Sequence, residues 1–330
     1  MTKGYTMSEH QTRKHCLLCG SDRINVHDSA PTNLIVDGYI KSYNINVESY
    51  FNLTSNMSLV GCEHCGLLSY EPMPAGDASF YEDLQRLPWY YQDIKPEYHF
   101  AKNHVDAQNR VLEVGCGKGV FRSFLDPSVS YRGLEFNQVA IDKAKSQGLD
   151  VTSQPIEIHA EQHPNEYDVV CHFQVLEHVS DPVGFLRACV KTLRPGGKLI
   201  VAVPAEDSFL SICENGWLNM PPHHVTRWKD STLKHAVESE LGLSLSAIWH
   251  EPVAEYHQDW YRSILVNHTL VKLLGRRDGL ISGKDFVIKV ARRLSKIKPI
   301  QNWLAKRAEQ KFPHAGRGHT VCIVGVKPAV

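Results

Sequence analysis

The strongest constraint on the fold is a regular alternation of short apolar runs and helical patterns that begins at Arg110. The apolar runs cover residues 110–114, 131–135, 167–173, 198–203 and 244–249. Segments with helical spacing lie between them, at residues 120–125, 138–147, 182–193 and 231–240. Strands that alternate with helices in this way predict an α/β fold, with a parallel sheet covered by helices on both faces.

A further strand candidate, residues 319–326, follows much later in the chain. Residues 250–318, about 70 in all, separate it from the preceding apolar run. A stretch of this length inside a compact domain must hold structure of its own. We therefore expect a helical insertion over residues 251–318, ahead of the last strand.

A glycine-rich loop follows the first apolar run, at Gly115-Cys116-Gly117-Lys118-Gly119. Glycines let the chain turn sharply and bring its backbone against a ligand without a clash from Cβ. Dehydrogenases hold pyrophosphate with a similar loop, so the glycines alone indicate only a nucleotide-like ligand.

Two acidic residues narrow the choice of ligand. Glu113 stands just ahead of the glycines, where a negative charge suits a cationic ligand such as a sulfonium amino acid and repels pyrophosphate. Glu135 ends the next apolar run, about where an acid must lie to accept both ribose hydroxyls.

Residues 110–249 resemble the class I S-adenosylmethionine-dependent methyltransferases. The likeness rests on five motifs in order: Val-Leu-Glu-Val-Gly-Cys-Gly-x-Gly at 111–119, Gly-Leu-Glu at 133–135, Tyr-Asp-Val-Val at 167–170, Val-Leu-Glu-His-Val at 175–179 with Asp-Pro at 181–182, and Leu-Arg-Pro-Gly-Gly at 193–197. The resemblance implies S-adenosylmethionine as the cofactor. It also implies a Rossmann-like sheet of seven strands, the last of them antiparallel.

The resemblance further implies where the cofactor lies. Glu135 would hold the ribose, the backbone of Phe173 and Gln174 would lie beside the cofactor, and Ile156, after a short third strand near residues 150–153, would flank the adenine. The expected cofactor-binding residues are Glu113, Gly115, Cys116, Gly117, Gly119, Glu135, Ile156, Phe173 and Gln174.

Four of the nine cysteines form two Cys-x-x-Cys-Gly turns, at residues 16–20 and 62–66. Four thiolates close a tetrahedral zinc site and leave no position open to substrate. We therefore expect Cys16, Cys19, Cys62 and Cys65 to bind a structural Zn²⁺ ion. The alternatives are unligated thiols or a redox-active pair.

The two cysteine pairs are far apart in the sequence for a simple zinc ribbon. The 42 residues between Cys19 and Cys62 exceed the roughly 15–20 of the simplest spacing. Apolar residues at 35–45 and 58–60 are rich in β-forming types. We expect them to supply strands that bring the pairs together.

A cysteine module ahead of a methyltransferase core resembles bacterial enzymes that modify sugars or secondary metabolites. The Leu-Glu-His-Val motif is also shared with quinone O-methyltransferases. These likenesses imply a small polar acceptor, above all a sugar of a bacterial glycan or natural product, methylated on oxygen or carbon.

Histidines are the candidates for acceptor chemistry. A hydroxyl acceptor must lose its proton to a general base or to a metal that lowers its pKa. Glu177 and His178 follow the fourth strand, and His223 and His224 follow two prolines in a later loop. We predict all four as catalytic or acceptor-binding residues, with Glu177 the weakest candidate.

Each of these residues has a plainer interpretation. Glu177 and His178 could cap the next turn, and one of the paired histidines could only pack against Trp217 or Trp228. The three histidines could also bind a metal, but no carboxylate spacing compels one, so we expect no catalytic metal.

A basic stretch lies in the predicted insertion. Residues 271–311 hold twelve Lys or Arg against three acids, and four of the basic residues recur at helical spacing. These four are Lys289, Arg292, Arg293 and Lys296. A solvated surface helix explains them as well as an anionic acceptor or contact with an anionic membrane surface through residues 284–298.

The composition sets the remaining expectations. The 36 basic residues balance 36 acidic ones, which is not the signature of a nucleic-acid-binding chain. No apolar run approaches 18 residues, and the first residues lack the pattern of a secretory signal. We expect a cytoplasmic protein, with peripheral association at the inner face of the membrane as an option.

These patterns predict five segments along the chain. They are a zinc-binding module (1–75), an aromatic-rich helical neck (76–105), a Rossmann-like methyltransferase core (106–250), a helical basic insertion (251–318) and a final antiparallel strand (319–330). The competing functions are an RNA or protein methyltransferase that holds its substrate with the zinc module, and a non-catalytic module that kept the cofactor fold.

Overall fold

Seven strands form the central sheet, in the order β10-β11-β8-β7-β4-β5-β6. Their bounds are β4 (Arg110–Val114), β5 (Ser130–Leu134), β6 (Asp150–Thr152), β7 (Tyr167–Phe173), β8 (Leu193–Pro204), β10 (Ser244–Pro252) and β11 (Arg317–Val326). Strand β11 runs antiparallel to both of its neighbours, while β8, β7, β4, β5 and β6 are parallel. The predicted α/β fold with a seven-stranded sheet and an antiparallel last strand is confirmed.

This structure is a computed structural model that describes residues 13–52, 54–87, 90, 95–276, 279–281, 290–291, 293 and 297–329. Within these residues the central strands are apolar on both faces, since helices cover both. One face packs against α5 (Ile156–Gln162), α6 (Pro182–Thr192) and α7 (Asp230–His235). The other packs against α3 (Pro96–Ala101) and the 3₁₀ turn Val120–Phe124, and α4 (Gln138–Ser146) covers the β5–β6 edge.

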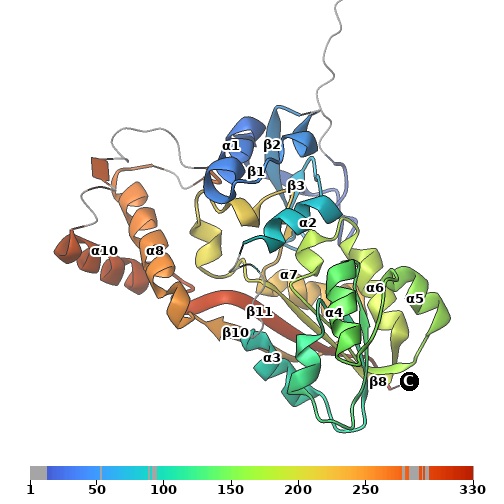
Figure 1. Cartoon of the computed structure of the whole chain (residues 1–330). Helices are drawn as coiled ribbons and strands as arrows, with labels where there is room; N and C mark the ends of the chain where they lie inside the picture. Colours follow the sequence, from blue (N-terminus) through green and yellow to red (C-terminus); the bar gives the residue numbers. More distant parts are fainter. Residues whose placement is uncertain are drawn as a thin grey trace, which may run out of the picture.

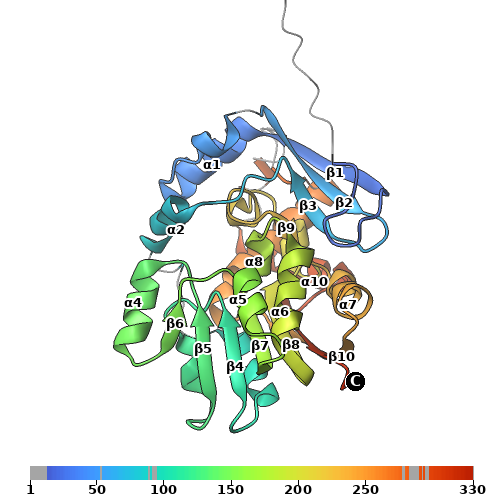
Figure 2. The ribbon, with the colours of Figure 1, turned by 90° about the vertical axis from the view of Figure 1, so that its right-hand side faces the viewer.

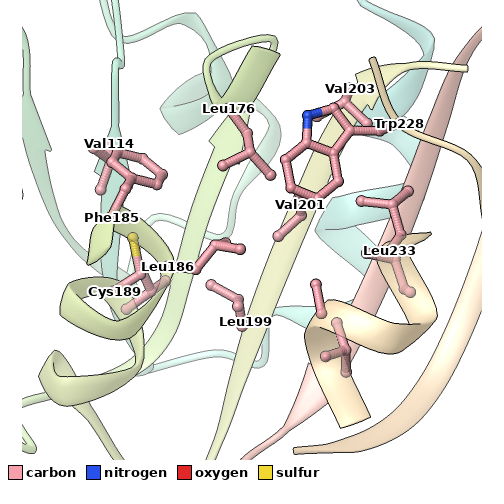
Figure 3. Packing of buried hydrophobic residues seen from close by; sticks show 14 of the residues in the cluster. Val114, Leu176, Phe185, Leu186, Cys189, Leu199, Val201, Val203, Trp228 and Leu233 are labelled. Atoms are coloured by element: carbon pink, nitrogen blue, oxygen red, sulfur yellow. The ribbon is translucent and has the colours of Figure 1, made fainter. Parts of the chain in front are cut away.

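The face under α6 and α7 holds the largest apolar core (Figure 3). Trp228 is fully buried there, beside Val203 and Leu233. Its indole nitrogen donates to the Thr226 hydroxyl at 3.0 Å, so the buried N–H is satisfied. Trp228 thus fixes the end of the loop that joins β8 to α7.

A second, four-stranded sheet has the order β1-β2-β3-β9. It consists of β1 (Ile24–Pro31), β2 (Asn56–Cys62), β3 (Leu68–Glu71) and β9 (Thr226–Arg227), so its last strand comes from the part of the chain that forms the central sheet. Figures 1 and 2 show this sheet and α1 (Thr32–Tyr43) at one end of the molecule, beyond the central sheet.

The expectation of strands over residues 35–45 was wrong, because most of that segment is helix α1. Ile35 and Tyr39 lie four residues apart and are both buried, which is the spacing of one helical face rather than the alternation of a strand. The strand expected at residues 58–60 does exist, as part of β2. Pairing of Ile24 in β1 with Cys62 in β2 brings the two cysteine turns together.

Helices α2 (Ala78–Gln85), α8 (Gln258–Leu273) and α10 (Lys298–Lys311) lie outside the layers that cover the central sheet. Helix α2 begins at Asp77, whose carboxylate accepts from the Phe80 amide. Helices α8 and α10 pack on each other through Val266, Leu304 and Ala305. Figure 1 shows this pair standing out from the side of the central sheet.

Candidate functional site

The glycine loop joins β4 to the turn Val120–Phe124 and carries three glycines with positive φ, at 71°, 54° and 75° for Gly115, Gly117 and Gly119. A Cβ on Gly119 would stand 2.3 Å from a Leu149 methyl carbon, so a larger residue there requires the Leu149 side chain to move. At Gly117 no heavy atom of the described residues lies within 4 Å of that position. The middle of the loop therefore offers open backbone to a ligand.

Glu135 closes over this loop from the end of β5. Its carboxylate accepts from the amide of Gly117 at 2.8 Å, and from the amides of Phe136 and Asn137, also at 2.8 Å. The side chain is half-buried, so it is fixed in position yet accessible to a ligand. A carboxylate held in this way can accept from two adjacent hydroxyls.

Glu113 lies beneath the loop and is buried, with 1% of its surface exposed. Burial raises the pKa of Glu113 to about 8, against the opposing effects of the Tyr131 hydroxyl and the Lys95 charge. The Tyr131 hydroxyl donates to Glu113 Oε2 at 2.6 Å. In the structure described here Glu113 is therefore largely protonated at neutral pH.

The other predicted cofactor residues lie either in the apolar core or at the end of β7. Cys116 and Ile156 are buried, and Ile156 packs in the core with Val114 and Leu134. Phe173 is buried at the end of β7, and Gln174, with φ of 59°, donates its amide to the Ala202 carbonyl at 2.8 Å. The backbone turns at Gln174, four residues before His178.

His178, His223 and His224 form a histidine cluster. One ring nitrogen from each lies within 4.8 Å of the others. The ring centroids are 4.7 Å apart for His178 and His223, and 4.3 Å apart for His223 and His224. Burial lowers the pKa of His178 to about 4 and lowers those of His223 and His224 well below the usual value, so all three imidazoles are neutral.

Glu177 lies against this cluster and is buried, with 1% of its surface exposed. Its Oε1 is 3.8 Å from His178 Nε2 and 4.0 Å from His224 Nε2. Among the described residues, neither carboxylate oxygen has a hydrogen-bond partner. Burial accordingly raises the pKa of Glu177 to about 8.

The glycine loop and the histidine cluster are neighbours. A Cβ on Gly115 would meet the Val175 side chain at 2.5 Å, and the His178 amide donates to the Val175 carbonyl at 3.0 Å. One residue, Val175, thus touches the loop on one side and the cluster on the other. Both stand at the carboxyl ends of parallel strands, where this architecture binds ligands.

The cysteines form a second cluster, where β1 begins and β2 ends, and three of them pack in the same apolar core as α7. The Sγ atoms of all four lie within 4.8 Å of one another. Cys16 and Cys65 are separated by 3.5 Å and Cys19 and Cys62 by 3.6 Å, far beyond a disulfide bond and near the roughly 3.8 Å edge of a ZnS₄ tetrahedron. Gly20 and Gly66 follow with φ of 68° and 79°, and the cluster fits a zinc ion.

Two tyrosines of the predicted aromatic-rich neck contact the histidine cluster. Helix α2 brings Tyr81 against His178, with ring centroids 5.7 Å apart. The Tyr90 hydroxyl lies 2.6 Å from His223 Nε2. An aromatic-rich neck was the only signal for these contacts, since nothing in the pattern shows which ring meets which histidine.

Of the four basic residues predicted at helical spacing, three fall outside the described residues. Lys289, Arg292 and Lys296 lie outside them, and Arg293 is described and exposed. Within the described ranges, no helix is both long enough and apolar enough to span a bilayer.

Residues 87–248 match a family model described as a methyltransferase domain. The ubiquinone biosynthesis O-methyltransferase of Yersinia pestis (strain Pestoides F) is 35% identical over 97 residues, which are 27% of this chain and 40% of that protein. The protein of the same name from Yersinia pseudotuberculosis (serotype I, strain IP32953) gives the same values. The chain therefore spans about 40% of the length of these curated relatives.

A solved structure described as a SAM dependent methyltransferase from Archaeoglobus fulgidus superposes with a TM-score of 0.50. The match covers 76% of this chain and all of that one, at 14% identity. At this identity the likeness shows the fold alone.

Proposed function

We propose that this chain, which carries a class I S-adenosylmethionine-dependent methyltransferase domain, transfers a methyl group to a hydroxyl of a small polar acceptor. The single observation that carries the proposal is the contact of Val175 with both the glycine loop and the histidine cluster. Because of this contact, one bound methyl acceptor could reach both the site of the methyl donor and the group that takes its proton.

The residues of the donor site fit S-adenosylmethionine. Gly117 leaves open backbone where a nucleoside can approach, and Glu135 presents a fixed carboxylate to two ribose hydroxyls. Glu113 can ionise beside the cationic amino-acid part of the donor, because a nearby positive charge lowers a carboxyl pKa. When bound, the donor supplies an electrophilic methyl group on sulfur.

The acceptor site supplies orientation and a route for the proton. Tyr81, Tyr90 and the histidine cluster offer hydrogen-bonding groups to a polar ligand. His178 is the candidate to take the hydroxyl proton, although burial lowers its pKa to about 4 and so makes it a weak base. A sugar of a bacterial glycan or natural product suits such a site, because it presents several hydroxyls to these groups. The relatives named as O-methyltransferases support oxygen as the methylated atom.

The cysteine cluster completes the proposal as a structural zinc site. Its four sulfur atoms already stand near tetrahedral spacing, and four thiolates leave no position for substrate. A zinc ion there would hold the two cysteine turns together, and through them β1 and β2.

Binding of S-adenosylhomocysteine tests the donor half. We expect titration calorimetry to give micromolar affinity for the full chain, reduced at least tenfold in Glu135→Ala. Glu157→Ala, which changes an exposed acid on α5, is the matched control and should bind as the parent does. A full chain that does not bind this product would overturn the proposal.

Radiolabelled methyl transfer to a panel of hydroxyl-bearing sugars and phenols tests the acceptor half. His178→Ala should lower turnover at least a hundredfold while S-adenosylhomocysteine affinity stays within twofold. Unchanged turnover in both His178→Ala and His223→Ala would remove the cluster from the reaction. Tight, steeply salt-dependent RNA binding would instead support the alternative of an RNA methyltransferase.

A further inference from the structure

The histidine cluster and Glu177 have the composition of a metal site. Three imidazoles with ligand nitrogens within 4.8 Å of one another come from two segments far apart in sequence, the turn after β7 and the loop before β9, and the Glu177 carboxylate lies beside two of them. Nitrogen and oxygen ligands in this number suit divalent transition-metal ions. Composition alone does not distinguish such a site from a packed core, so the orientation of the rings decides.

Each of the three rings uses Nδ1 in a hydrogen bond to an oxygen. His178 Nδ1 lies 2.6 Å from the His223 carbonyl, His223 Nδ1 lies 2.7 Å from the Leu218 carbonyl, and His224 Nδ1 lies 3.1 Å from Asn219 Oδ1. Carbonyl oxygens only accept, so Nδ1 donates in every case. Every ring is thereby held in the tautomer that leaves a lone pair on Nε2, which is how metal-binding histidines are oriented.

Glu177 provides the second, independent observation. A carboxyl buried without a hydrogen-bond partner among the described residues is costly, whether or not it is ionised. Its Oε1 lies 3.8 Å from His178 Nε2 and 4.0 Å from His224 Nε2, so the carboxylate faces the two nitrogens that do not make the Nδ1 hydrogen bonds. A cation between these atoms would satisfy both the carboxylate and the lone pairs.

We propose that His178, His223 and His224, together with Glu177, bind one divalent transition-metal ion. This reverses the expectation of no catalytic metal that the sequence supported. The Tyr90 hydroxyl, 2.6 Å from His223 Nε2, must turn away from that nitrogen or become an oxygen ligand when the ion binds.

The position of the ion indicates a role in methyl transfer, an inference that rests on the proposed function. It would stand beyond the end of β7, in the turn that follows Val175, whose side chain lies against the glycine loop. An acceptor hydroxyl bound to the ion has a lower pKa and gives up its proton more readily. The proton would then pass to water, because His178 would be a ligand of the ion and not the base that takes the proton in the metal-free site.

Cobalt(II) binding to the metal-stripped full chain tests the site, because the d–d absorption bands of cobalt depend on its ligands. We expect two cobalt ions per chain, one with thiolate-to-metal bands and one without. In Cys16→Ser only the ion without thiolate bands should remain. In the double variant His223→Ala and His224→Ala only the thiolate-bound ion should remain.

Two variants make the assignment specific. Glu177→Gln keeps the shape of the side chain but removes its charge, and we expect at least a tenfold loss of cobalt affinity at the second site. His163→Ala removes a half-buried histidine paired with Glu166 away from the cluster, and should bind two ions as the parent does.

The parent chain alone can refute the proposal. If cobalt at tenfold excess fills only the thiolate site, the histidine cluster binds no metal, whatever the variants do. Binding of the metal ion requires neither the methyl donor nor the methyl acceptor. A chain that binds the second ion but transfers no methyl group would therefore contradict the proposed function while leaving the metal site standing.

Discussion

Gly117 is the residue at which an added side chain should both weaken ligand binding and strain the backbone. Its φ of 54° costs any other residue about 1 to 2 kcal/mol, but no described atom obstructs a Cβ. Gly117→Ala should therefore fold with a slightly lower Tm and bind S-adenosylhomocysteine at least tenfold more weakly by calorimetry.

The control for this prediction is Gly148→Ala. Gly148 has φ of 80° and equally open surroundings, in the exposed turn after α4. It should show a similar loss of stability with unchanged affinity. Equal affinities in the two variants would mean that the ligand does not approach Gly117.

The buried carboxyl of Glu113 makes stability depend on pH. Burial raises its pKa to about 8 in the folded chain, from 4.5 when exposed. The Tyr131 hydroxyl and the Lys95 charge oppose this rise, and the Glu135 charge adds to it. Because the folded pKa is raised, the stabilisation is full below pH 4.5 and is lost as the pH rises through 8. Between pH 5 and pH 8.5 the free energy of unfolding should therefore fall by roughly 2 to 4 kcal/mol less in Glu113→Gln than in the parent.

Urea unfolding at the two pH values, without cofactor, measures this difference. Glu157→Gln is the control, since that side chain is exposed and should leave the pH dependence of the parent unchanged. A parallel fall of stability in Glu113→Gln and the parent would show that Glu113 ionises normally in the folded chain.

At the scale of elements, the loop between β8 and α7 presents His223 and His224, and a buried ion pair holds it. Arg227 donates to Glu206 at 2.8 Å and to the Leu210 carbonyl at 3.2 Å, and both charged side chains are buried. Removing one partner of such a pair leaves an uncompensated charge, at a cost of about 3 to 5 kcal/mol.

Glu206→Gln should accordingly destabilise the chain by several kcal/mol in urea unfolding. Asp150→Asn is its matched control, because it breaks the partly exposed pair with Arg132 by the same acid-to-amide change and should cost about 1 kcal/mol or less. Similar losses in the two variants would contradict a buried, ionised pair at Glu206.

Sequence patterns predicted six of the seven strands of the central sheet, because each of these six carries its own apolar run, while the short strand β6 was expected only from the family resemblance. β4 and β7 have the predicted bounds, and β11 begins two residues earlier than expected. Residues 35–45 misled because β-forming types there follow a helical spacing. Periodicity, rather than residue type, decides such a segment.

The histidine cluster could be predicted only in part. Sequence placed His178 at a strand end, but what brings His223 and His224 to it is tertiary. The Tyr39 hydroxyl donates to the Met220 carbonyl at 3.0 Å, and the Tyr70 hydroxyl to the Asn219 carbonyl at 2.8 Å. These residues lie about 150 to 180 positions apart, and no local pattern encodes such a contact.

At the scale of the whole molecule, the same contacts connect the cysteine cluster to the acceptor site. Cys62 ends β2, β2 pairs with β3, and β3 pairs with β9 two residues after His224. The Tyr70 amide in β3 also donates to the Val225 carbonyl. A structural zinc ion would thus support the histidine loop from a distance.

Loss of this zinc ion should therefore affect the acceptor half of the reaction and spare the donor half. We expect Cys16→Ser to lose one zinc ion by elemental analysis, with a lower Tm, because the free energy of metal binding contributes to folding. Methyl transfer should fall several-fold while S-adenosylhomocysteine affinity stays within twofold. Cys213→Ser, which changes a half-buried cysteine outside the cluster, should alter neither zinc content nor donor affinity. If Cys16→Ser weakened donor binding as much as turnover, the module would stabilise the whole fold rather than the histidine loop.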